Sequence, residues 1–196
     1  MKRAWLAIGI AAMIVAAGCA AVLGFRAPAL RSEAAVGEMA PVWTETKWPF
    51  LLDQWGIGKA YVCQPADCGA RIEVFIRPKI GFCNCATGVS DDTELERVAD
   101  TDLVSPAVQP LGPGRPAKVG WMYGLSRTYQ ISAEKPGERL LSVAFNDACD
   151  VVVGLALLGK ADPAAAAPAV IAFLTSTPVV LWAKKELGLE FVRREW

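Results

Sequence analysis

The chain has 196 residues, with 20 Lys and Arg against 20 Asp and Glu, and it contains no histidine. Beyond the N-terminal segment, the only short basic runs are Lys184-Lys185 and Arg193-Arg194, so we expect no nucleic acid partner, because phosphate binding needs clustered cations. The missing histidine excludes Ser-His-Asp and Cys-His catalysis and every histidine-ligated metal centre. We find no acid–base pair to name, so we expect a protein that is not an enzyme and has no catalytic residues.

A run of 22 uncharged, mostly apolar residues, Ala4 to Phe25, follows the first three residues of the chain. Its length favours a transmembrane anchor, because a span needs roughly 17 to 25 apolar residues and a cleaved signal roughly 7 to 15. Lys2 and Arg3 outweigh Arg26, which keeps the N-terminus cytoplasmic. We predict a single-pass inner-membrane protein that contacts the membrane through residues 4–25 and holds its C-terminal domain in the periplasm.

Two alternatives stay open for this segment. Small residues such as Cys19-Ala20-Ala21 offer a cleavage site, which would give a secreted or periplasmic protein. The residues Ala16-Ala17-Gly18-Cys19 also resemble the bacterial lipoprotein signal, in which Cys19 would become the acylated N-terminus. All three readings export the rest of the chain, and an oxidising compartment favours disulfides.

The remaining chain is divided by composition. Residues 26–47 contain Pro28, Gly37 and Pro41 without a sustained period, which is typical of a linker that follows the anchor or signal at residues 1–25. Residues 48–188 are expected to form a single extracytoplasmic domain, followed by a tail at residues 189–196.

The first expected elements of this domain are two strands and a helix. Residues 59–63 read as a strand, and residues 71–77 alternate with Ile72, Val74 and Ile76 on one face and a polar outer side. Ser90 and Asp91 are expected to cap a solvated helix that reaches about residue 99, since their side-chain oxygens accept from free first-turn amides. The six acids from Asp91 to Asp102 lack the spacing of a calcium loop.

A proline- and glycine-rich loop over residues 106–116 precedes a series of strands. The expected strands cover residues 119–123, 128–132, 140–145 and 149–158, with Asn146-Asp147 as the turn between the last two. These two strands are predicted to be antiparallel neighbours. Residues 151–158 show no alternation, which predicts a central strand covered on both faces.

Two helices are expected to end the domain. Asp162-Pro163 combines a capping side chain with a first-turn proline, and Ala167, Val170, Ile171 and Leu174 then form one buried stripe. Thr177-Pro178 predicts a second helix that carries Lys184 and Lys185 in its last turn and stops at Gly188.

The C-terminal half resembles PsbP-like domains. The resemblance rests on residues 140–145, the hairpin into residues 151–155, and Asp162-Pro163 with the helix that follows. It implies an α+β fold, an antiparallel sheet covered by helices as an α/β/α sandwich, and an accessory or binding role on the exported side of a membrane. The whole chain also resembles uncharacterised bacterial membrane-tethered exported proteins, whereas its cysteine-rich N-terminal half departs from the PsbP-like pattern.

Five cysteines follow Cys19 in the sequence, and structural disulfides are their favoured interpretation. Cys63 and Cys68 enclose a loop short enough to bridge, and Cys149 is expected to join Cys83 or Cys85, which leaves one thiol over. Alternatively, Cys63, Cys68, Cys83 and Cys85 converge on a zinc ion at one end of a β-ribbon, although neither pair has the usual two-residue spacing. Cys83-Asn84-Cys85 as a redox pair is the third interpretation.

Two functional hypotheses follow from these patterns. The first is a membrane-tethered extracytoplasmic binding or accessory protein without catalytic activity or cofactor, stabilised by disulfides, whose partner is an unidentified protein or small molecule. The second is a cysteine-centred module, either a structural zinc site or a thiol–disulfide redox site, formed by Cys63, Cys68, Cys83 and Cys85.

Overall fold

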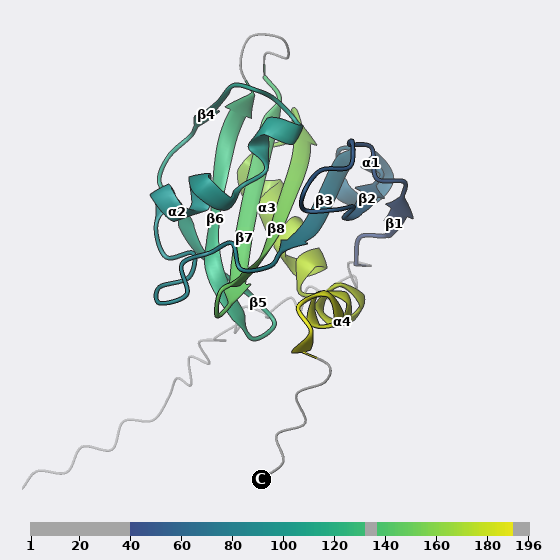
Figure 1. Cartoon of the computed structure of the whole chain (residues 1–196). Helices are drawn as coiled ribbons and strands as arrows, with labels where there is room; N and C mark the ends of the chain where they lie inside the picture. Colours follow the sequence, from purple (N-terminus) through teal and green to yellow (C-terminus); the bar gives the residue numbers. More distant parts are fainter. Residues whose placement is uncertain (1–39, 132–136, 190–196) are drawn as a thin grey trace, which may run out of the picture. The chain divides into compact units, whose positions relative to one another are not determined.

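The computed structural model of the chain describes residues 40–131 and 137–189, and these residues belong to one compact unit. The predicted anchor or signal at residues 1–25, Cys19, the linker up to residue 39 and the tail from residue 190 lie outside the described residues. The fold is α+β, with a large antiparallel sheet and a few helices (Figure 1).

Within the described residues the sheet has eight strands in the order β1-β2-β3-β8-β7-β6-β4, and β5 pairs with β6 beside this path. Every pairing is antiparallel. The strands are β1 (Trp43–Thr46), β2 (Lys59–Cys63), β3 (Ile72–Lys79), β4 (Val108–Pro110), β5 (Arg115–Val119), β6 (Met122–Ile131), β7 (Arg139–Asp147) and β8 (Asp150–Gly159).

The strand β8 occupies the position expected of a central strand. It lies between β3 and β7, pairs antiparallel with both, and is largely buried along its length. The turn before it, however, comes two residues later than predicted. Asp147 pairs with Asp150, so Ala148 and Cys149 form the turn, and Ala148 adopts the positive φ of 50° that the turn requires.

The strand predicted at residues 119–123 is wrong, because a hairpin turn divides it. Val119 ends β5 and pairs with Met122, the first residue of β6, so Gly120 and Trp121 form the turn. Gly120 has a φ of 59°, which glycine adopts without steric cost. The strand expected at residues 128–132 is the second half of β6, and the expected loop at 106–116 contains β4 and the start of β5.

The folded domain begins earlier than residue 48. The strand β1 pairs with β2 inside the range that was expected to be linker. Its first residue, Trp43, stacks on Phe173 with ring centroids 4.4 Å apart. Strand pairing and aromatic packing therefore add residues 43–46 to the domain.

The helices α3 (Pro163–Leu174) and α4 (Thr177–Glu186) pack on one face of the sheet. As predicted, the Asp162 carboxylate accepts a hydrogen bond from the Ala164 amide, 3.0 Å away, at the start of α3. Val170 and Leu174 of the predicted stripe are buried in the same cluster as β3 residues, whereas Ala167 and Ile171 lie at its margin.

The other face of the sheet is covered by α2 (Asp92–Val98), the 3₁₀ turn η1 (Thr101–Leu103) and the segment that follows β1. Of the two expected caps, Ser90 and Asp91, it is Asp91 that caps α2, since its carboxylate accepts from the Glu94 amide at 2.8 Å. The side of β3 opposite Ile72, Val74 and Ile76 was predicted to be a polar outer side. It carries charged residues but is not an outer side, because Phe75 and Arg77 are buried beneath this layer, as is Lys79 further along the strand. The short helix α1 (Pro65–Cys68) follows β2.

Candidate functional site

The five cysteines in the described part of the chain form two pairs at disulfide distance and leave one buried thiol. Cys63 pairs with Cys68, with α-carbons 6.0 Å apart, and Cys85 pairs with Cys149, with α-carbons 4.2 Å apart. Cys83 is free and buried. Of the two partners expected for Cys149, the structure places Cys85 beside it.

The four cysteines of the zinc hypothesis do not come together. In the described part of the chain, no group of three or more Cys, Asp or Glu side chains is arranged to hold a metal ion. The reason is the strand β3, which separates the two cysteine pairs. Eight residues of strand span about 26 Å, so Cys63 and Cys68 lie near one end of β3 while Cys83 and Cys85 follow its other end.

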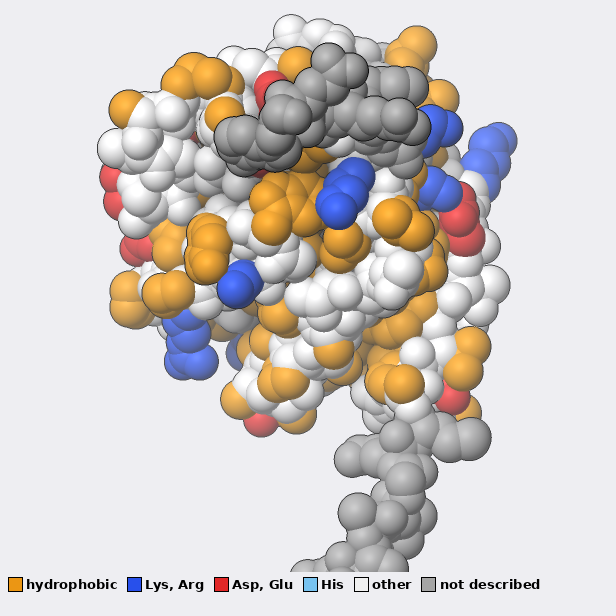
Figure 2. All heavy atoms as spheres, turned by 90° about the horizontal axis from the view of Figure 1, so that it is seen from below, with side chains coloured by type: hydrophobic (Ala, Val, Ile, Leu, Met, Phe, Trp, Pro, Cys, Tyr) orange, Lys and Arg blue, Asp and Glu red, His pale blue; other side chains and the backbone are white. Residues whose placement is uncertain are grey.

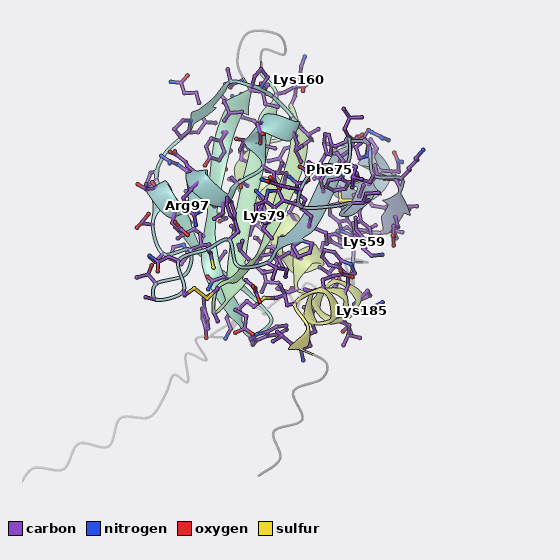
Figure 3. All side chains as sticks on the ribbon, in the orientation of Figure 1. Lys59, Phe75, Lys79, Arg97, Lys160 and Lys185 are labelled. Atoms are coloured by element: carbon purple, nitrogen blue, oxygen red, sulfur yellow. A yellow bond between two sulfur atoms is a disulfide. The ribbon has the colours of Figure 1, made fainter. Side chains whose placement is uncertain are left out.

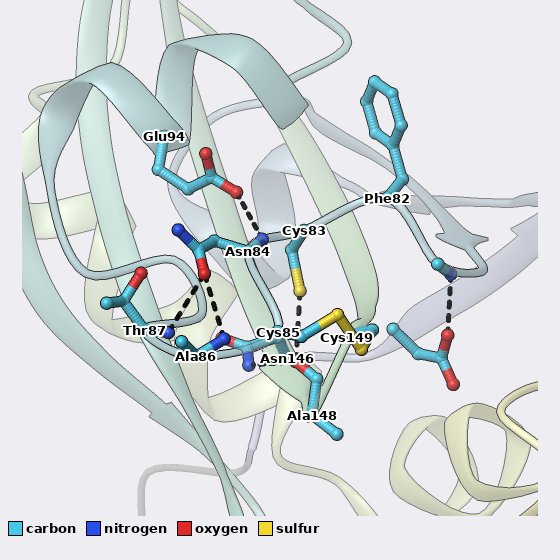
Figure 4. Close-up of a disulfide and its surroundings, with 12 residues drawn as sticks. Phe82, Cys83, Asn84, Cys85, Ala86, Thr87, Glu94, Asn146, Ala148 and Cys149 are labelled. Atoms are coloured by element: carbon cyan, nitrogen blue, oxygen red, sulfur yellow. Dashed lines mark hydrogen bonds between the residues drawn. A yellow bond between two sulfur atoms is a disulfide. The ribbon is translucent and has the colours of Figure 1, made fainter.

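The segment from residue 81 to residue 90, here called the cysteine loop, is fastened to the β7–β8 turn (Figure 4). The Cys85–Cys149 disulfide is one link. The Cys83 amide donates to the Cys149 carbonyl at 3.1 Å, and the Cys83 thiol donates to the Ala148 carbonyl at 3.2 Å. At the far end of the loop, the Val89 amide donates to Asn146 Oδ1 at 2.9 Å. These contacts fix the loop at the end of the sheet where β7 turns into β8.

Asn84 organises the middle of the cysteine loop. Its side-chain oxygen accepts from the amides of Ala86 and Thr87, at 2.9 and 3.3 Å, which is an Asx turn (Figure 4). The backbone amide of Asn84 donates to the Glu94 carboxylate of α2 at 2.8 Å. The loop is therefore held by α2 on one side and by the β7–β8 turn on the other.

A pocket of about 340 Å³ lies between the cysteine loop and the β5–β6 hairpin. Its lining contains no charged side chain: a few hydroxyl and amide groups stand among apolar atoms. The lining residues are Thr87, Val89, Ser90, Pro116, Ala117, Tyr123, Gly124, Leu125 and Asn146. This is the composition of a site for a small neutral ligand, because apolar walls supply contact area and a few polar groups set orientation.

Two glycines allow the walls of this pocket to come close. Gly88 has a φ of 61° and sits against the Asn146 side chain, where a β-carbon would collide with it. Gly124 lies directly against the Ala144 carbonyl of the neighbouring strand. Larger residues at either position would displace the wall or the floor of the pocket.

The Cys83 thiol is kept in its protonated form. Burial raises its pKa above the ordinary value of 9.0, and the nearby carboxylates of Glu94 and Asp150 raise it further, against a smaller opposing effect of Arg97. A redox-active thiol usually has a lowered pKa and an exposed sulfur. Cys83 has neither property. The nearby Cys85, which forms the disulfide with Cys149, is exposed.

A second polar cluster, which the sequence did not suggest, lies under α2 and η1. Arg77 is 3% exposed and makes two hydrogen bonds of 2.7 Å to Asp100 and two further bonds to Asp53. Lys79 donates to the Val98 carbonyl at 2.7 Å and pairs with Asp100 at 2.6 Å. Two cations thus face two carboxylates, so the cluster is internally neutral and fully engaged in holding the covering layer to β3.

Comparisons with protein-family models, with curated proteins and with solved structures found no match to this chain. The sequence did not indicate this pocket, because its residues come from separate elements; Ser90 and Asn146 were expected only as cap and turn residues. Among residues 40–131 and 137–189, no single helix has the length and apolar character to cross a membrane; α3 and α4 meet that criterion only together, and they are bent by 60°.

Proposed function

We propose that this chain is a membrane-tethered extracytoplasmic binding or accessory protein without catalytic activity, and that the pocket beside the cysteine loop holds its ligand. The tether is the apolar run from Ala4 to Phe25. Two disulfide pairs suit an exported domain, and helices on both faces of the sheet are compatible with a PsbP-like α/β/α arrangement. The main support for the proposal is the pocket itself. The cysteine loop forms one of its walls and is held by α2 on one side and by the β7–β8 turn on the other.

The ligand expected from the lining is small and neutral. No lining side chain carries a charge, and Thr87, Ser90 and Asn146 supply the hydrogen-bonding groups. The volume of about 340 Å³ lies at the lower end of small-molecule sites. Because the disulfide and the Asn146 contact already fix the wall, little ordering of the loop is required when a ligand binds.

A panel of neutral fragments tests this proposal by ligand-observed and backbone-amide NMR. We expect fragments to shift the amides of the cysteine loop and of the β5–β6 hairpin. Thr87→Trp should abolish these shifts, because Thr87 is exposed at the pocket wall and a large ring there fills the space. Thr93→Trp is the matched control, since Thr93 is exposed on α2 and does not line the pocket. Fragments that bind Thr87→Trp unchanged would refute the pocket as the site.

The tether is tested separately on the full chain expressed in a bacterial host. We expect the protein to stay in the membrane fraction after alkaline extraction, with an intact mass that includes residues 1–25. A mature protein that begins near residue 20 and is soluble would show signal cleavage instead. A diacylated N-terminal Cys19 would show a lipoprotein.

The position of the Cys83 thiol, bonded to the residue before Cys149, is the observation behind a second candidate, internal thiol–disulfide exchange, which the raised pKa of Cys83 confines to alkaline pH. The Cys83 amide donates to the Cys149 carbonyl at 3.1 Å, so the two cysteines are direct neighbours in space. The deprotonated Cys83 sulfur would attack Cys149 Sγ, the Cys85–Cys149 bond would break, and Cys85 would leave as a thiolate that takes up a proton. The exchange needs no external oxidant.

Disulfide mapping distinguishes this candidate from a static bridge. After incubation at alkaline pH, where Cys83 ionises, peptide mass mapping should find both Cys83–Cys149 and Cys85–Cys149. Cys83→Ser should retain the Cys85–Cys149 bond alone. Wild-type protein that shows only Cys85–Cys149 at every pH would exclude the exchange.

A further inference from the structure

The β5–β6 turn and α4 together form one end of the domain. Gly120 of the turn lies against Val180 of α4, where an added β-carbon would come within 3.4 Å of the valine. Lys184 of α4 places its ammonium 4.9 Å from the centre of the half-buried Trp121 ring. One residue pair further along, on the opposite side of the hairpin where Tyr123 also lines the pocket, Lys118 lies 5.0 Å from the centre of the Tyr123 ring. We call this end the lysine–aromatic face.

The lysines of this face have no carboxylate partner among the described residues. In that part of the chain, Lys118, Lys184 and Lys185 form no ion pair, as also holds for Arg115 and Lys160, whereas Arg77, Lys79 and Arg127 are each paired with a carboxylate. Figure 2 views this end from below: Lys and Arg side chains stand among hydrophobic ones, and acidic side chains lie towards the edges. The positive charge of the face is therefore directed outward.

Apolar and aromatic groups accompany the lysines. Leu181 is 52% exposed and Tyr123 is 63% exposed, although each would gain free energy from leaving water. Trp182 is half-buried on the same helix. Aromatic rings with an aliphatic side chain between lysines match the membrane–water boundary, where rings reside among headgroups and lysines extend to the phosphates.

We propose that the lysine–aromatic face docks on a bilayer that contains anionic phospholipid, so that the tethered domain lies against the membrane. The inference rests on the proposed tether, which keeps the domain close to a bilayer. An anionic surface supplies the counter-charge that the lysines lack within the domain. The uncharged run from Ala4 to Phe25 is a poorer occupant for the same face, because it offers the ammonium groups no counter-charge.

The experiment uses the full chain with vesicles of phosphatidylcholine alone or mixed with phosphatidylglycerol. Co-sedimentation tests the tether, and we expect the chain to sediment with both compositions. Hydrogen exchange then tests the face. The amides of the β5–β6 turn and of α4 should exchange about fivefold or more slowly with phosphatidylglycerol present, since each lysine near an anionic surface changes binding roughly fivefold.

The matched variants remove charge without changing side-chain length much. Lys184→Gln/Lys185→Gln should lose the lipid-dependent protection. Lys160→Gln should keep it, because Lys160 is also exposed but lies at the opposite end of the sheet from Lys185 (Figure 3). Equal exchange in both lipids, with the chain still sedimenting, would overturn the docking face and leave the tether intact. A chain that sediments with neither would overturn both.

Discussion

At the scale of single residues, the buried charges on β3 decide how the covering layer is held. Both carboxylate oxygens of Asp100 accept hydrogen bonds from Arg77, and Asp100 also forms an ion pair with Lys79. Burial by itself lowers the pKa of Arg77, but the hydrogen bonds from Asp100 and Asp53 raise it overall. Such a cluster fixes one alignment of α2 and η1 over the sheet, because any shift leaves a buried charge without its partner.

We predict that Asp100→Asn lowers the free energy of unfolding by about 3–5 kcal/mol, because it leaves Arg77 and Lys79 buried without their shared carboxylate. Glu73→Gln is the control. It removes the more exposed ion pair with Arg71 and should cost less than about 1 kcal/mol. Urea unfolding measures both variants. Similar small losses for the two would show that the buried cluster contributes little to stability.

The raised pKa of Cys83 gives a pH dependence with a definite sign. The native state favours the protonated thiol, so this contribution to stability is fully present below the unfolded-state pKa, near 9.0, and is lost as pH rises through the higher native value. Wild-type protein should therefore lose stability at alkaline pH relative to Cys83→Ala. Denaturant titrations at several pH values measure this difference, and a constant difference would contradict it.

At the scale of elements, the two disulfides are expected to contribute unequally. Cys85–Cys149 closes a sequence separation of 64 residues, whereas Cys63–Cys68 closes only 5. The chain-entropy model gives about 4 kcal/mol for the first and about 2 kcal/mol for the second. Guanidinium unfolding of Cys85→Ser/Cys149→Ser and Cys63→Ser/Cys68→Ser compares them. A larger loss from the short loop would indicate that local strain or packing, and not loop closure, sets their effect.

Elements with local chemical signals could be predicted from the sequence, and elements that depend on tertiary context could not. The caps at Asp91 and Asp162 sit beside their helices in the chain, so both helix starts were found. The turn at Gly120 was missed because a single glycine inside an apolar run also suits a strand. The burial of Arg77 depends on Asp100, 23 residues away, which no periodicity reveals. The pocket likewise depends on how the β5–β6 hairpin packs beside the cysteine loop, which the expected pairing of Cys149 with Cys83 or Cys85 did not indicate.

At the scale of the whole molecule, one sheet joins the N-terminal and C-terminal halves of the domain, which differ in their sequence patterns. The cysteine-rich N-terminal part supplies β1 to β3, the C-terminal part supplies β7 and β8, and β3 pairs directly with β8. Phe173 of α3 adds a second connection, since its ring contacts Trp43 at 4.4 Å and Tyr61 at 4.8 Å between centroids. We infer that the domain has one cooperative core.

This continuity predicts that the oxidised domain unfolds in a single transition. Far-UV circular dichroism follows the sheet and helices, near-UV signals follow the packed aromatics, and their denaturant midpoints should coincide. Phe173→Ala should shift both midpoints together, with a loss of about 3–5 kcal/mol, because the ring is 9% exposed and lies between α3 and the first two strands. A variant in which only the near-UV transition moves would show that β1 and β2 unfold independently of the β3–β8 centre.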